Sequence, residues 1–200
     1  MLILFSCSST RFVDSWKSEA LAPGFHSDKM LVLAITDNLT ARQIFEEELC
    51  KALHERGVNN EKAYGTLEAD YTRARLSEAE IDQMAAELVS KGFDAAIITS
   101  VKGVERRHLH EPATVYVYPY YGRFGRYYYY YQDIYYDPPG YQEYDVYHVE
   151  SALYKLGGDE ANTLVWVGSF DITDPISIRQ TVDDYVKSLI AKMDQEGILD

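Results

Sequence analysis

A chain of 200 residues, of which 46% are hydrophobic, is long enough for one globular domain with a buried core. Its formal net charge of −13 excludes nucleic acid as the main partner, because nucleic-acid binders cluster lysine and arginine and no basic stripe occurs here. Two cysteines, Cys7 and Cys50, exclude both a disulfide framework and a metal site built from several thiolates.

The first nine residues combine a short apolar run with a cysteine. Leu4-Phe5-Ser6-Cys7 resembles the lipobox of bacterial lipoprotein export signals, in which a small residue directly precedes the lipidated cysteine. The resemblance implies acylation of Cys7 and stable anchoring, and Ser8 after it implies sorting to the outer membrane, facing the periplasm, in a Gram-negative host. The run has no preceding lysine or arginine and is about half the usual length, so the alternative is an incidental cysteine in a disordered tail. Because the chain has no apolar run of about 18 residues, we expect membrane attachment only through an added lipid or a partner.

The segment after this cysteine is polar and lacks a sustained helical or strand period. Pro23-Gly24 interrupts it, so residues 8–29 are predicted to be a tether or a loosely docked arm that Trp16 pins. About 22 extended residues would reach roughly 70 Å. We assign residues 1–29 to a lipobox remnant and tether, and residues 30–200 to a single α/β domain with a Tyr-rich insertion at 112–147.

A strand and a helix open the predicted domain. Residues 30–36 (MLVLAIT) are almost continuously apolar, which is typical of a strand covered on both faces. Thr40-Ala41-Arg42-Gln43 has the spacing of a capping box and predicts a helix that ends at Gly57 and packs Cys50. Arg42 and Glu46, four residues apart near the edge of its apolar face, form either an ion pair or a solvated edge, and we expect the solvated edge.

The alternation continues through the middle of the chain. Residues 62–67 are predicted as a short strand, a capping box at Ser77–Glu80 begins a helix that ends at Gly92, and residues 93–101 form another apolar strand. The order strand, helix, strand, helix, strand implies right-handed crossovers and parallel pairing.

The carboxyl-terminal part adds a hairpin and a helix. Residues 146–156 and 164–172 are β-rich and joined by Gly157-Gly158-Asp159, which predicts antiparallel pairing. Asp174-Pro175 is predicted to cap a last, amphipathic helix that ends at Gly197. The expected fold class is therefore α/β, with a mixed sheet of about five strands and three helices.

Most of the chain's 18 tyrosines lie in the insertion at 112–147. Repeated prolines and glycines exclude one continuous helix there and predict a long hairpin or loop that projects from the sheet. Tyrosine offers a flat contact area and a hydroxyl, so the segment is predicted to contact an envelope protein, a glycan or another copy of the chain. The alternatives are a biased surface loop and tyrosines that pack on one another in an oligomer. The expected contact residues are Tyr116, Tyr118, Tyr120, Tyr121, Tyr128, Tyr130 and Tyr135.

Several short motifs together resemble a group of uncharacterised bacterial lipoproteins with an α/β domain of unknown function. The resemblance spans residues 7 to about 196 and implies an exported, lipid-anchored domain, without any catalytic residue to transfer to this chain. Glu150 and Trp166 lie in the matching strands and are expected to be packing or edge residues. The matching pieces are MLVLAIT, Arg42 to Glu46 (RQIFE), Gly57-Val58, FDAAIITSVKGVE, VESALYKL and TLVWVGSFDIT.

The sequence contains no Walker loop, dinucleotide glycine fingerprint, Gly-x-Ser-x-Gly elbow or zincin motif. His108 and His110 alternate beside Glu105 and Glu111, either as metal ligands or, as we expect, as solvated residues at a strand end. We therefore predict no cofactor, no metal and no catalytic residue, and a noncatalytic cell-envelope lipoprotein that binds or assembles through its Tyr-rich segment. The alternative is an envelope enzyme of unidentified class, which would show a polar cleft lined by perturbed titratable groups.

Overall fold

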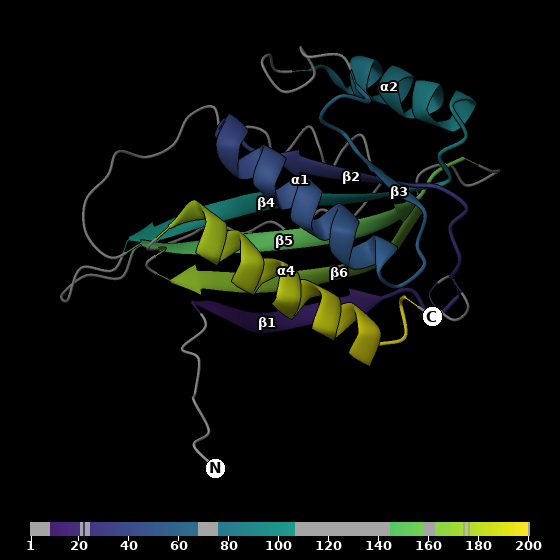
Figure 1. The fold of residues 1–200 in the computed structure, drawn as a ribbon. Helices are drawn as coiled ribbons and strands as arrows, with labels where there is room; N and C mark the ends of the chain where they lie inside the picture. Colours follow the sequence, from purple (N-terminus) through teal and green to yellow (C-terminus); the bar gives the residue numbers. More distant parts are fainter. Residues whose placement is uncertain are drawn as a thin grey trace.

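The computed structural model contains a six-stranded mixed sheet with helices on both faces (Figure 1). It describes residues 9–20, 22, 25–67, 76–106, 145–157, 163–173, 175 and 177–199. The strand order is β1-β6-β5-β4-β2-β3, and the expected α/β class with a mixed sheet and three helices is confirmed. The strands are β1 (Thr10–Lys17), β2 (Met30–Ile35), β3 (Asn60–Lys62), β4 (Ala95–Arg106), β5 (Asp145–Lys155) and β6 (Thr163–Thr173), and the helices are α1 (Leu39–His54), α2 (Glu78–Ser90) and α4 (Ile178–Gln195).

The parallel part of the sheet is centred on β2, which pairs with β3 on one side and β4 on the other. Every residue of β2 is buried, because α1 and α4 cover one face of the sheet and α2 covers the other (Figure 1). Val32 and Ala34 belong to the first core layer, whereas Leu31 and Leu33 belong to the second. The predicted strand at 62–67 is shorter and earlier, at Asn60–Lys62, because the chain turns at Gly65, where φ is 97°.

The carboxyl ends of the three described helices lie where the sequence predicts them, whereas the amino-terminal caps of two helices differ from the prediction. Gly57, Gly92 and Gly197 all have positive φ, as expected of helix stops, and Ser77 and Glu80 form the predicted capping box. The cap of α1 is Asn38 rather than Thr40, because the Asn38 Oδ1 accepts a hydrogen bond from the Ala41 N–H at 3.0 Å. The cap of α4 is Ser177 rather than Asp174-Pro175, because its Oγ accepts from the Gln180 N–H at 3.3 Å.

The largest departure from the sequence prediction is β1. Residues 10–17 were expected within a tether, but they pair antiparallel with β6 and form an edge of the sheet. A β-bulge between Phe12 and Asp14 adds one residue to β1. After the bulge, the odd-numbered side chains point to the face of the sheet that the even-numbered side chains occupy before it. Phe12 and Ser15 therefore both face α4: Phe12 packs under Lys192, and the Ser15 Oγ donates to Glu196. This bulge explains why no strand period is visible in the sequence.

The second half of the sheet is antiparallel. β5 pairs with β4 and β6, as the predicted hairpin at residues 146–172 requires. The last pair between β4 and β5 joins Arg106 to Asp145, the two residues that flank 107–144, the part of the sequence that holds most of the Tyr-rich insertion. Within the described residues, no helix has the length and apolar character needed to cross a bilayer.

Candidate binding cavity and polar network

A cavity of about 450 Å³ lies between the first turns of α1 and α4, above the carboxyl ends of β2 and β4. Its position follows from the topology. α1 follows the carboxyl end of β2 and α4 follows that of β6, and both helices cover the same face of the sheet, so their first turns flank a space beyond these strand ends (Figure 1). Ligands of open α/β sheets bind outside the carboxyl ends of the strands, which is where this cavity lies.

The lining of the cavity is mostly apolar and includes several residues with hydroxyl groups. Thr99 and Tyr185 are among them, and their hydroxyls both hydrogen-bond to the buried Ser151, at 2.9 Å in the case of Tyr185. Burial raises the pKa of Tyr185 above its ordinary value despite the hydrogen bond with Ser151, so its hydroxyl stays neutral. The apolar wall residues are Ala34, Ile35, Phe45, Val101, Val104, Val149, Ile172 and Val182.

The mouth of the cavity is polar but poor in ionisable groups. Asn38 and Ser177, the caps of the two helices, stand at the mouth together with Thr36, Asp37 and Thr181. Among the described lining residues, Asp37 is the only carboxylate, and none is a histidine, cysteine, lysine or arginine. This lining suits recognition of an apolar body that carries a hydrogen-bonding group, and it offers no described pair of groups for acid–base chemistry.

The buried carboxylate of Glu46 binds the backbone of a residue that lines the cavity. The Glu46 side chain is fully buried, and its two oxygens accept hydrogen bonds from the Ala34 N–H at 3.1 Å and the Tyr64 N–H at 2.7 Å. β3 ends opposite Val32, so the Ala34 N–H further along that edge of β2 has no strand carbonyl, and Glu46 takes its place. The expected solvated edge at Arg42 and Glu46 is therefore wrong, since both side chains are buried.

Burial raises the pKa of Glu46 to about 7, although the two backbone hydrogen bonds and the nearby Arg42 guanidinium lower it. Glu46 lies next to Phe45 on α1 and binds the backbone of Ala34 on β2, and both of these residues line the cavity. The protonation state of Glu46 is therefore coupled to the hydrogen bond that connects α1 to β2.

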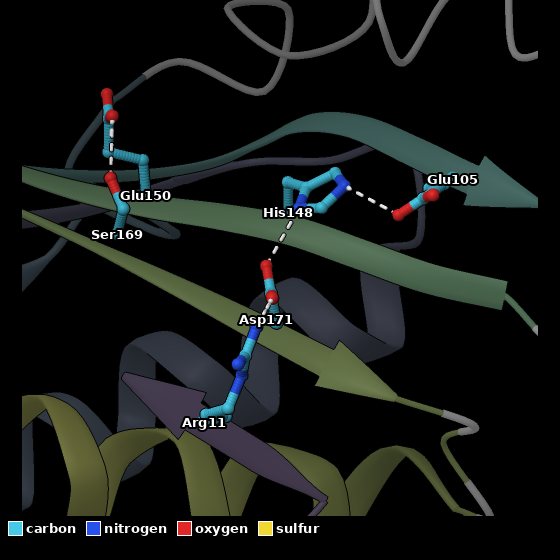
Figure 2. Close-up of polar contacts among 6 residues, drawn as sticks. All are labelled: Arg11, Glu105, His148, Glu150, Ser169 and Asp171. Carbon is cyan, nitrogen blue, oxygen red and sulfur yellow. Dashed lines mark hydrogen bonds and ion pairs between the residues drawn. The ribbon is translucent and has the colours of Figure 1, made fainter. Parts of the chain in front are cut away.

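Charged side chains form a network on the face of the sheet opposite α1 and α4 (Figure 2). Asp171 on β6 accepts from the Arg11 Nη2 at 2.7 Å with one oxygen and lies 2.7 Å from the His148 Nδ1 with the other. The His148 Nε2 is 3.8 Å from the Glu105 Oε2, which is ion-pair range rather than a hydrogen bond. Burial raises the pKa of Asp171, but hydrogen bonds from Arg11 and His148 outweigh it and hold the pKa below its usual value.

Beside this network, Glu150 is fully buried and its Oε2 accepts from the Lys102 Nζ at 2.7 Å and the Ser169 Oγ at 3.2 Å. The two clusters join side chains from four neighbouring strands, β1, β6, β5 and β4. In the part of the chain that the structure describes, no three histidine, cysteine, aspartate or glutamate side chains are arranged to hold a metal ion. The clusters connect neighbouring strands through their side chains, and Arg11 attaches the edge strand β1 to the sheet.

The residues predicted from the sequence fall in two groups. Cys7, the tyrosines from Tyr116 to Tyr135, His108, His110 and Glu111 all lie outside the described residues. Glu150 and Trp166 are buried, and the Trp166 Nε1 donates to the Glu196 Oε2 at 2.6 Å. Cys50 is a half-buried free thiol, and burial raises its pKa to about 12.

No family model and no curated protein matches this chain. Its fold is similar to that of the PelC dodecamer from Paraburkholderia phytofirmans, at 16% identity over 95% of this chain and 96% of that one, with a TM-score of 0.45. It is also similar to the lipoprotein GNA1162 from Neisseria meningitidis, at 14% identity over 84% of this chain and 98% of that one, with a TM-score of 0.43. At this level the likeness carries no information on function.

The cavity itself was not predicted from the sequence. Its lining comes from both helix starts and from several strands, and it brings together residues as far apart in the chain as Ala34 on β2 and Tyr185 on α4. The available signal was the order of elements, because it places the start of a helix directly after β2 and again after β6.

Proposed function

We propose that this protein is a lipid-anchored, noncatalytic envelope domain that binds a ligand or partner at the end of the sheet where β2 and β4 finish. The cavity between α1 and α4 is the observation that carries the proposal. Its volume lies within the range of about 300–1,000 Å³ typical of small-molecule sites, and it combines apolar walls with a few hydroxyls. The bound group therefore has an apolar body and at least one hydrogen-bonding group.

The Tyr-rich segment is proposed to contribute to the same binding end. Val104 and Tyr147 line the cavity, and they lie two residues from Arg106 and Asp145, between which residues 107–144 are inserted. Tyrosines presented from this position would add contact area at little cost in side-chain entropy. The partner proposed for this segment is an envelope protein, a glycan or a second copy of the chain.

Lipidation of Cys7 is proposed from the lipobox resemblance, with the outer membrane, facing the periplasm, as the location. The protein extracted from its native membrane is expected to lack residues 1–6 and to carry two or three acyl chains on Cys7. Intact-mass spectrometry measures both changes at once. A mass that matches the unmodified chain with Met1 in place would contradict the anchor.

Filling the cavity is expected to weaken the binding of an apolar probe. Ala41 lines the cavity on the first turn of α1 and is only half-buried, so Ala41→Phe places a ring in the cavity without removing core volume. We expect the affinity for N-phenyl-1-naphthylamine, measured by fluorescence titration, to fall by about tenfold or more, which corresponds to the loss of about 1.4 kcal/mol of apolar contact.

The matched control is Ala79→Phe, because Ala79 is an exposed alanine in the first turn of α2. It is expected to leave probe binding unchanged, and thermal unfolding checks that both variants fold. Equal affinities of the two variants would contradict the cavity as the binding site.

In pull-downs from envelope extracts, deletion of Tyr116 to Tyr144 tests the Tyr-rich segment, whose proposed role fails if the captured partners stay the same.

A further inference from the structure

The path from the lipid to the domain is short. Cys7 is three residues from Thr10, the first residue of β1, and three extended residues span at most about 11 Å. Thr10 pairs with Ile172, and Ile172 lines the cavity. An acyl group on Cys7 therefore holds the corner of the sheet beside the cavity within about 11 Å of the lipid surface, not at the distance that a tether of residues 8–29 would allow.

Exposed apolar side chains lie at the same end of the molecule. Leu39 and Ile178 are the first residues of α1 and α4, directly after the caps at the cavity mouth, and they are 44% and 40% exposed. The starts of β1, α1 and α4 all lie at the end of the sheet where β4 finishes (Figure 1). Arg106 and Asp145, which flank residues 107–144 in the sequence, pair at the same end.

We propose that the cavity end of the domain is a membrane-facing surface, which rests on the lipid headgroups of the bilayer that holds Cys7. This inference relies on the proposed anchor and deepens the proposed function, since the cavity then opens toward the lipid surface and its ligand is a membrane amphiphile. The contact is apolar and interfacial rather than electrostatic, because the chain's net charge of −13 repels anionic headgroups.

The geometry can be tested without native lipidation. Coupling Cys7 to a maleimide lipid in phosphatidylcholine vesicles reproduces the short connection, and Cys50 does not compete because burial raises its pKa to about 12 and suppresses its thiolate. Quenching by headgroup nitroxide lipids then reports how close a tryptophan lies to the membrane. Trp16→Phe removes the exposed background, and the buried Trp166 is common to all variants.

Two matched probes compare the two ends of the sheet. Ile178→Trp places the probe at the cavity end, whereas Val89→Trp places it beside Gly157, at the other end of β5, roughly 35 Å away along the strand. Both native side chains are 40% exposed. We expect quenching at position 178 to exceed that at position 89 by about twofold or more, because quenching falls steeply over such a distance.

The short connection is tested by inserting a flexible Gly/Ser linker of about twelve residues after Ser8, which adds roughly 20 Å of reach. This insertion is expected to reduce quenching at position 178 toward the value at position 89. Equal quenching at both positions, or quenching that the linker leaves unchanged, would overturn the membrane-facing surface. Neither quenching result depends on acylation in the cell. The mass measurement on Cys7 therefore tests the proposed anchor separately from the membrane-facing surface.

Discussion

Replacing Glu46 with glutamine is expected to remove most of the pH dependence of the free energy of unfolding between about pH 4.5 and pH 7. In the native protein burial raises the pKa of Glu46 from 4.5 to about 7, so within this window the folded chain holds a proton that the unfolded chain has released. The stability that Glu46 contributes is fully present below about pH 4.5 and is lost as the pH rises through 7. A shift of this size corresponds to a decline of about 3 kcal/mol.

The measurement is urea unfolding at a series of pH values from 4.5 to 8. Glu47→Gln is the matched control, because Glu47 is the next residue of α1 and is exposed, and it should keep the native decline. Asp94 and Asp171 act in the opposite direction, but only near and below pH 4, since their pKa values are lowered by hydrogen bonds that outweigh burial. A decline that persists in Glu46→Gln would show that Glu46 titrates normally.

Replacing Gly168 with alanine is expected to lower the free energy of unfolding by about 3 kcal/mol, at the upper end of overpacking effects. The Trp166 indole lies over Gly168 in the core between β6 and α4, and a Cβ at Gly168 would meet the indole Cη2 and would lie 2.7 Å from its Cζ2. The ring cannot move away freely, because Trp166 is fully buried and its Nε1 donates to Glu196.

A double-mutant cycle with Trp166→Phe separates this steric cause from a general effect on the strand. Phenylalanine lacks the outer ring atoms that clash, so the cost of Gly168→Ala should fall by about 1 kcal/mol or more when Trp166 is already Phe. Chemical unfolding of the four chains gives the coupling energy directly. Additive costs within about 0.5 kcal/mol would rule out the indole as the cause.

The predictions that succeeded depend on neighbours in the chain. The buried strand at Met30–Ile35, the capping box at Ser77 and the helix stops at Gly57, Gly92 and Gly197 all need only local spacing and local backbone preference. The two misplaced helix caps are also local, but more than one side chain near each start is able to cap it: Asn38 caps α1 ahead of the predicted Thr40, and Ser177 caps α4 after the predicted Asp174-Pro175.

The candidate site could be predicted only in part. The order of elements places the start of a helix after β2 and after β6, but the residues that line the cavity come from four strands and two helices, and only their packing decides which side chains meet. Glu46 shows the same limit. Its spacing from Arg42 suggests a surface pair, whereas its environment depends on the point at which β3 stops and leaves the Ala34 N–H without a strand partner.

By itself, the sequence determined the α/β class, the parallel and antiparallel halves of the sheet, the resemblance of Cys7 to a lipidation site and the Tyr-rich composition of the insertion, because these follow from local patterns. The tertiary structure alone decided that residues 10–17 are an edge strand, since a bulge hides their period and their partner, β6, lies near the other end of the chain. That pairing shortens the connection to Cys7 and brings the anchor to the same end of the sheet as the cavity, a relation that depends on long-range hydrogen bonds and cannot be read from spacing along the chain.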